Sequence, residues 1–294
     1  MDEAASGDTT AAERKISGYG FGTTDVVLSV DEVEQAAGEL ATRGPDCARL
    51  EALVGGAPFV TIEGLVAGYG RMEILHGFDL RLGRGQSLCL IGPNGAGKST
   101  VLHSIFGLAT IMSGTIRIGD RDVTRVASHR KLRDAGVAYV LQDNSVFPDM
   151  SVEENLFLGG YLLPRTREAR HAAARVFERN PRLAERRRQR AGVLSGGERR
   201  LLEISRALIM DPAVLLVDEP SIGLEPRYID MVFDLLSELT RGEGRTIIMV
   251  EQNARKGLEF ADLGYVLVAG RTALAGHGRE LLDDPEVGRL FLGG

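Results

Sequence analysis

Apolar residues beyond residue 58 fall into short continuous runs that alternate with amphipathic stretches. Because strands alternate with helices along the chain, this pattern predicts an α/β fold with a largely parallel sheet and crossover helices. The runs typical of buried strands are residues 86–91, 137–141, 214–217 and 246–250, and the stretches with helical spacing are residues 98–108 and 227–241.

Residues 144–200 have a different pattern and are predicted to form a helical subdomain inserted into the sheet. Ser151 and Glu154 have the spacing of a capping box, which marks a helix start. Five arginines follow between residues 182 and 190, interspersed with Glu185. Such a run is typical of a solvated helix face, so it does not by itself indicate a phosphate or nucleic-acid site.

The first 57 residues form an N-terminal extension. Residues 1–27 show no helical or strand period, which is typical of a mobile tail. Ser29 and Glu32 then make a capping-box pattern that predicts one short helix, and residues 46–54 predict a second. Gly55-Gly56-Ala57-Pro58 ends the pattern, so we place the boundary between an extension, 1–57, and the main domain, 58–294. Deletion of 1–57 is therefore expected to leave the activity of the main domain nearly intact.

Charge separates these two parts. The extension carries eleven acidic and four basic residues, a net charge of −7, so the rest of the chain sums to +1 of the total of −6. Nucleic-acid binding calls for a basic patch, and this distribution argues against a nucleic-acid partner. No run approaches the roughly 20 apolar residues that span a bilayer, and no secretory segment opens the chain, so we expect a cytoplasmic protein. Cys47 and Cys89 form no ligand cluster, and Cys89 is expected to be a buried free thiol.

A complete phosphate-binding motif follows the first predicted strand. Residues 92–100 fit the pattern G-x-x-x-x-G-K-[ST] in the strand, glycine loop and helix context that the motif requires. Backbone N–H groups and the helix N-terminus can hold phosphates, a lysine can reach the β and γ oxygens, and a hydroxyl can bind Mg²⁺. The motif predicts ATP and Mg²⁺ as cofactors, bound by Gly92, Pro93, Asn94, Gly95, Ala96, Gly97, Lys98, Ser99 and Thr100.

Two acids end the apolar run at residues 214–217. A buried strand would deliver Asp218 and Glu219 to the carboxyl edge of the sheet, where ligands of open α/β sheets bind. Asp218 is suited to hold Mg²⁺, and Glu219 to orient and deprotonate an attacking water as general base.

A second glycine-containing loop has no phosphate chemistry of its own. It comprises Leu194, Ser195, Gly196, Gly197 and Glu198, and it opens a predicted helix over residues 198–209. A helix N-terminus with small residues is suited to receive an incoming phosphate. Two phosphate loops with one nucleotide's chemistry between them predict a site built across a dimer.

The motif order GPNGAGKST, Gln142, LSGGE, VLLVDEP and SIGLEP resembles the nucleotide-binding subunit of an ABC transporter. The resemblance covers residues 59–294. It implies a RecA-like core with a small antiparallel β subdomain and a helical subdomain, and two subunits that close head to tail over two ATP molecules. A second ATPase subunit, identical or a sister, is thus an implied partner.

The resemblance also implies roles for single residues. Tyr69 corresponds to the aromatic that stacks on adenine, and Gln142 to the residue that contacts Mg²⁺ and water. Residues 194–198 would reach ATP bound by the opposite subunit. Most of the family has a histidine where Gln252 stands; glutamine can donate a hydrogen bond to the γ-phosphate but cannot shuttle a proton. Glu219 is therefore expected to carry the proton chemistry, with Gln252 and Lys98 positioning the phosphate.

The sequence VEQN at residues 250–253 and the C-terminal segment resemble one ATPase subunit of importers for branched-chain amino acids. Importers of urea and short amides are similar, and a soluble ABC ATPase or a regulatory ATP-binding protein are alternatives. An importer implies transmembrane permease subunits and indirectly a periplasmic binding protein. The expected docking surface is the helical region just after Gln142, including Phe147, Pro148 and residues 150–158. Docking there would hold the chain on the inner face of the cell membrane.

Overall fold

The computed structural model describes residues 44–142 and 145–292. Its centre is a six-stranded sheet in the order β10-β9-β3-β8-β7-β6. Four of its five strand pairings are parallel, and the fifth joins β10 antiparallel to β9. All four predicted strands are present. The strands are β3 (Ser87–Ile91), β6 (Val137–Val140), β7 (Val214–Asp218), β8 (Thr246–Val250), β9 (Leu263–Val268) and β10 (Arg271–His277).

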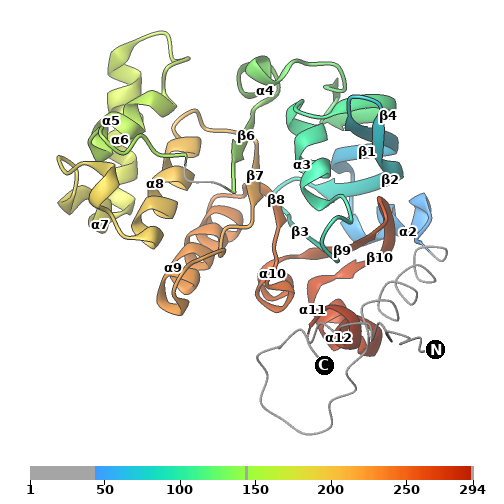
Figure 1. The fold of residues 1–294 in the computed structure, drawn as a ribbon. Coiled ribbons are helices and arrows are strands. Elements are labelled where there is room, and N and C mark those ends of the chain that lie inside the picture. The colour runs from blue at the N-terminus through green and yellow to red at the C-terminus, as the bar shows by residue number, and fades with distance from the viewer. Residues whose placement is uncertain (1–43, 143–144, 293–294) are drawn as a thin grey trace, which may run out of the picture.

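A second, antiparallel sheet packs beside the first and has the order β2-β1-β4-β5 (Figure 1). Its strands are β1 (Pro58–Tyr69), β2 (Met72–Gly83), β4 (Thr110–Ile118) and β5 (Arg121–Asp122). Both sheets contribute to one apolar core, in which Leu80 and Leu90 are fully buried. The antiparallel β subdomain that the resemblance implied is therefore confirmed.

Helices cover the six-stranded sheet. Helix α3 (Lys98–Phe106) follows β3 as predicted. The predicted helix over residues 227–241 is α9 (Pro226–Ser237), which continues as a π-helical turn, η2 (Glu238–Gly242). The hydroxyl of Thr240 donates to the carbonyl of Leu236 at 3.1 Å, a side-chain bond that competes with regular helix geometry. The remaining helices are α4 (Ser128–Ala135), α10 (Ala254–Phe260), α11 (Gly278–Asp283) and α12 (Pro285–Phe291).

The helical subdomain lies at one end of the six-stranded sheet and has its own core (Figure 1). The predicted capping box is present, with the backbone N–H of Glu154 donating to the Ser151 hydroxyl at 3.2 Å. The last helix, α8, packs on β6 and α9 as well as on α5, and so connects the subdomain to the sheet. Its elements are α5 (Val152–Gly159), α6 (Thr166–Arg179), α7 (Pro181–Glu185), η1 (Ala191–Val193) and α8 (Gly196–Leu208).

Packed structure begins before residue 58. The second predicted short helix is α2 (Cys47–Val54), capped by Asp46 and packed on β2. Leu50 on this helix is fully buried in the core shared by the two sheets. The helix predicted after Ser29 lies outside the described residues. Cys47 is exposed and Cys89 is a buried free thiol, as expected.

Candidate functional site

The sheet order brings the predicted site residues to one edge. Strand β8 pairs with β3 on one side and with β7 on the other, and β6 pairs with β7. The loops after these parallel strands therefore meet at their carboxyl ends. These loops carry the phosphate loop, Asp218 with Glu219, Gln252 and Gln142.

Glycines let the phosphate loop approach its neighbours closely. Gly92 has φ of 141°, and a Cβ there would lie 2.1 Å from the carbonyl oxygen of Leu267. Gly97 has φ of 99° and caps α3 without a side-chain bond, so the helix N-terminus is not covered by a capping side chain. Ala96 and Thr100 are buried, whereas Asn94 and Gly95 are exposed.

Lys98 lies inside this loop. Its Nζ donates to the carbonyl oxygens of Gly92 at 2.8 Å and Pro93 at 2.9 Å, so its ammonium group sits at the centre of the loop. Burial lowers the pKa of Lys98, and the charges of Glu219 and Asp218 partly oppose that shift. The three groups are therefore electrostatically coupled across the site.

The side-chain oxygens of Ser99 and Asp218 lie next to each other. The Ser99 hydroxyl donates to Oδ1 of Asp218 at 3.2 Å, and the hydroxyl of Tyr139 donates to Oδ2 at 2.8 Å. Burial and the adjacent Asp218 raise the pKa of Tyr139, so its hydroxyl stays protonated as a donor. Mg²⁺ is usually bound through one or two protein oxygens together with waters and substrate phosphates. Ser99 and Asp218 supply oxygens of the kind that this pattern calls for, side by side at the phosphate loop.

Glu219 stands immediately beyond β7 in the left-handed region, with φ of 43°. Its Oε2 accepts a hydrogen bond from Nε2 of Gln142 at 2.9 Å, so Gln142 joins the site through Glu219. Burial and the neighbouring Asp218 raise the pKa of Glu219 above its ordinary value. A raised pKa and partial exposure suit a group that accepts a proton from water.

Arg200 on α8 supports both acids, and sequence reasoning missed it. Its guanidinium donates to the backbone carbonyls of Asp218 at 2.7 Å and Glu219 at 3.1 Å, and it forms a buried ion pair with Glu203 at 3.0 Å. The arginine lies only two residues beyond Glu198, the last residue of the second glycine loop. Helix α8 therefore connects that loop rigidly to the acidic end of β7.

Gln252 is exposed at the same sheet edge, just after β8. Its neighbour Glu251, which sequence reasoning also missed, is almost fully buried. The carboxylate of Glu251 accepts from the hydroxyl of Ser221 at 2.7 Å and from the backbone N–H of Asn253 at 2.9 Å. Burial raises the pKa of Glu251. This side chain ties the loop after β7 to the loop that presents Gln252.

Tyr69 lies at the end of β1 and is 45% exposed, which leaves its ring face accessible. Its hydroxyl is hydrogen-bonded to Nδ1 of His103, on the helix that follows the phosphate loop, at 2.5 Å. Burial lowers the pKa of His103. The predicted adenine-stacking residue is thus attached to α3.

The second glycine loop lies on the helical subdomain, away from the phosphate loop of the same chain. None of the hydrogen bonds in the described part of the chain joins the two loops. Leu194 is buried in the subdomain core, and the Glu198 carboxylate pairs with Arg186 at 2.7 Å. A Cβ on Gly197 would lie 2.3 Å from the ring of Tyr228. Ser195 and Gly196 are the half-exposed positions that remain available to a ligand.

A phosphate loop between a strand and a helix, with an acid pair at the end of a neighbouring strand, defines a P-loop nucleoside triphosphatase. The model of the ABC transporter family matches residues 75–222. BraG of Pseudomonas aeruginosa, a high-affinity branched-chain amino acid transport ATP-binding protein, is 41% identical over 77% of this chain and 96% of its own length. LivF of Archaeoglobus fulgidus, a probable branched-chain amino acid transport ATP-binding protein, is 37% identical over 78% of this chain and 96% of its own.

Among solved structures, the ADP conformation of the ATP-binding cassette MJ1267 has a TM-score of 0.72 and 27% identity, over 81% of this chain and all of that one. The chain belongs to the ABC transporter family of ATP-binding subunits. It is a nucleotide-binding ATPase, and its core is the RecA-like fold that the resemblance implied. Among the described helices, none combines the length and apolar character needed to cross a bilayer.

Proposed function

We propose that this chain hydrolyses ATP to drive an importer of branched-chain or other hydrophobic amino acids. The observation that carries the catalytic part is the grouping of Lys98, Ser99, Asp218 and Glu219 at one sheet edge. In this proposal Lys98 holds the β and γ oxygens, while Ser99 and Asp218 hold Mg²⁺, which neutralises charge on the phosphates. Glu219, oriented by Gln142, takes a proton from the attacking water.

The complete site in this proposal spans two subunits. Ser195 and Gly196 are half-exposed at the N-terminus of α8, and no hydrogen bond among the described residues joins them to Lys98, Asp218 or Glu219. A helix N-terminus can bind the γ-phosphate of ATP held by a facing subunit. The internal bonds of Leu194 and Glu198 then hold the loop in shape, and Ser195 with Gly196 makes the contact.

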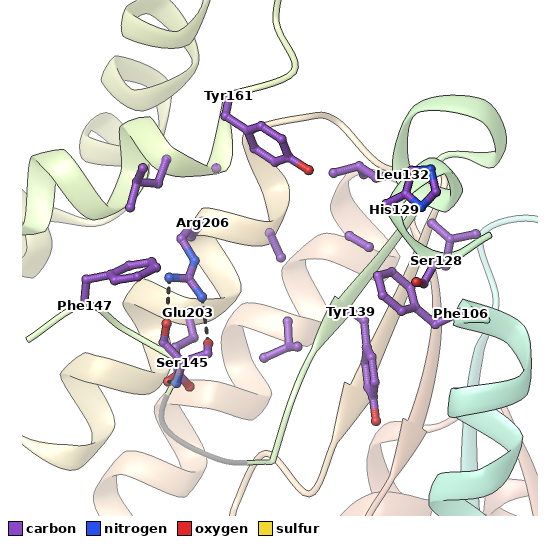
Figure 2. A pocket seen from close by; sticks show the side chains of 16 residues that line it. Phe106, Ser128, His129, Leu132, Tyr139, Ser145, Phe147, Tyr161, Glu203 and Arg206 are labelled. Carbon is purple, nitrogen blue, oxygen red and sulfur yellow. Dashed lines mark hydrogen bonds between the residues drawn. The ribbon is translucent and has the colours of Figure 1, made fainter. Parts of the chain in front are cut away.

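We also propose that permease subunits dock in a groove between the sheet and the helical subdomain. The groove has a volume of about 700 Å³. Figure 2 shows Phe147, Tyr161, Leu132 and Phe106 around it, from both parts of the molecule. Phe147 is 50% exposed. An apolar groove of this kind suits a short helix of a membrane subunit, which would hold the ATPase at the membrane.

The choice of cargo is supported by the two branched-chain relatives and by VEQN at residues 250–253. The test is uptake of radiolabelled leucine in the source organism with and without the gene, restored by the wild-type chain. Glu219→Gln should lower hydrolysis by roughly 10²- to 10⁴-fold, the range for loss of a general base, while ATP binding persists. Glu286→Gln on α12 is the control and should leave turnover unchanged. Normal turnover in Glu219→Gln refutes its role as base, and uptake of urea or an amide instead of leucine refutes the cargo.

A further inference from the structure

Tyr139 connects the groove with the nucleotide site. It lies on β6, and its ring lines the groove beside Phe106, with the ring centroids 5.5 Å apart. Figure 2 shows the hydroxyl of Tyr139 pointing away from the other labelled side chains of the groove. That hydroxyl donates to Oδ2 of Asp218 at 2.8 Å. One half-buried side chain therefore touches both places.

The hydrogen bond restrains the carboxylate that the proposed function assigns to Mg²⁺. Asp218 is almost fully buried, and its two oxygens accept from two different hydroxyls, those of Ser99 and Tyr139. If the Ser99 hydroxyl served Mg²⁺ as a ligand, Tyr139 would remain as the side-chain donor that holds the carboxylate. Groups that hydrogen-bond to a metal ligand orient it and influence metal affinity strongly.

The environment of the ring determines how Tyr139 could move. On the groove side, the ring of Tyr139 packs against Phe106. On the side toward Tyr69, it lies edge-on to His103, and the two ring centroids are 5.8 Å apart. The rings of Phe106 and His103 come from the helix that begins at Lys98. A displacement of the groove wall would therefore shift the Tyr139 hydroxyl relative to Asp218, because close-packed rings have little free space to absorb it.

We propose that Tyr139 is a positioning residue that fixes Asp218 for Mg²⁺ binding and couples the occupancy of the groove to that site. The inference rests on the proposed role of Asp218 as a Mg²⁺ ligand. A protein segment seated in the groove would press on the ring, and the hydroxyl would transmit the change to Oδ2. No proton or bond is transferred in this step.

The first test removes only the hydroxyl. Tyr139→Phe should raise the Mg²⁺ concentration for half-maximal ATPase activity about tenfold, with kcat at saturating Mg²⁺ changed less than twofold, which is the low end for loss of such an outer contact. Tyr265→Phe is the matched control, because it also loses a buried hydroxyl, bonded to the backbone of Arg81 at 3.1 Å. It should leave the Mg²⁺ dependence unchanged. An unchanged Mg²⁺ dependence in Tyr139→Phe, or an equal shift in Tyr265→Phe, overturns the inference.

Asp218→Asn separates this inference from the proposed function. Its Mg²⁺-dependent nucleotide binding should be weakened more than that of Tyr139→Phe. If Asp218→Asn binds Mg²⁺ and nucleotide normally, the proposed function fails. If Asp218→Asn is impaired and Tyr139→Phe is not, only the inference fails.

The second test measures the coupling directly. The chain contains no tryptophan, so Phe106→Trp introduces a single fluorescent reporter against Tyr139 in the groove wall. Mg²⁺ added to the ADP complex should change its emission, and the change should disappear when Tyr139→Phe is combined with it. Phe147→Trp, on the opposite side of the groove, should respond little. A signal that persists without the Tyr139 hydroxyl would exclude the coupling, whatever the kinetic result.

Discussion

Leu50 offers a direct test of where the folded protein begins. Its side chain is fully buried in the core between the two sheets, although it lies within the segment that the sequence assigns to an extension. Replacement of a buried leucine by alanine costs about 2–5 kcal/mol, because apolar contacts are lost and a cavity remains. We expect Leu50→Ala to lower the free energy of unfolding by about 3 kcal/mol, within the range for a buried leucine whose surroundings partly close the cavity.

The same reasoning gives the effect of truncation. Deletion of residues 1–57 removes both Leu50 and Val54, the second of which is 8% exposed. Full burial of such a side chain stabilises the fold by about 1.5–3 kcal/mol, so the deletion should lower the free energy of unfolding by about 3–6 kcal/mol. The whole free energy of unfolding of a protein is usually about 5–15 kcal/mol. Deletion of residues 1–45 keeps α2 and its Asp46 cap and should therefore retain the stabilisation that Leu50 and Val54 provide.

Urea unfolding followed by circular dichroism measures these differences, with Glu51→Ala as the control. Glu51 is on the same helix, and its carboxylate lies 3.7 Å from Nε of Arg81 while 59% of its side chain is exposed. Exposed pairs of this kind contribute about 0–1 kcal/mol. A Leu50→Ala variant as stable as the wild type, or equal stability of the two truncations, would show that α2 does not pack as described. At temperatures where it stays folded, the longer truncation should keep its ATPase activity, because the main contacts of α2 are with β2 and β10 rather than with the phosphate loop or the end of β7.

Three further predictions concern the site. Ser195→Arg should abolish hydrolysis by the dimer and leave ATP binding by the monomer intact, measured by turnover and by nucleotide titration; normal turnover would contradict the two-subunit site. The acid limb of the kcat/KM profile should lie above pH 4.5, the ordinary value for a glutamate, because the pKa of Glu219 is raised and the base must be ionised to act; a limb at or below that pH would contradict its role. Glu251→Ala should lower both turnover and stability, since the donors of Ser221 and Asn253 lose their acceptor at about 1–3 kcal/mol each, whereas Glu251→Gln should retain most of both. Equal effects of these two substitutions would indicate that Glu251 does not hold the loops by its oxygens. 

Glu251 also predicts how stability varies with pH. The pKa of Glu251 is higher in the folded protein than in the unfolded chain. The stability that Glu251 contributes is therefore fully present at pH values below its unfolded pKa, and it is lost as the pH rises through its folded pKa. Glu251→Gln should remove this decline of stability with rising pH, because glutamine does not ionise.

The local patterns of the sequence located most of the fold's parts. The strands β3, β7 and β8 and the helix α3 were all predicted within one residue or two, because a buried strand and an amphipathic helix are each visible in a short window. The phosphate loop is also local: its glycines, Lys98 and Ser99 lie within nine residues. Helix ends were less accurate, as in α9, where the π-helical turn depends on a bond from Thr240 to the preceding turn.

Contacts between distant residues were decided by the tertiary structure alone. Tyr139 and Asp218 are 79 residues apart and meet only because β6 pairs with β7. Arg200 reaches the carbonyls at the end of β7 through the direction of α8, and Leu50 enters the core through the packing of α2 on β2. No spacing in the sequence signals these contacts, since they depend on sheet order and on how helices are laid over it.

The sequence by itself determined the class of protein, the phosphate loop with its acid pair, and the presence of a second glycine loop. Only the tertiary structure decided that this second loop lies apart from the phosphate loop, with Leu194 and Glu198 turned inward and Ser195 and Gly196 outward. The physical reason is that sequence patterns report only on residues that are close together along the chain. Motif and periodicity are properties of neighbouring residues, whereas the side that a loop presents is determined by what its other side must bury.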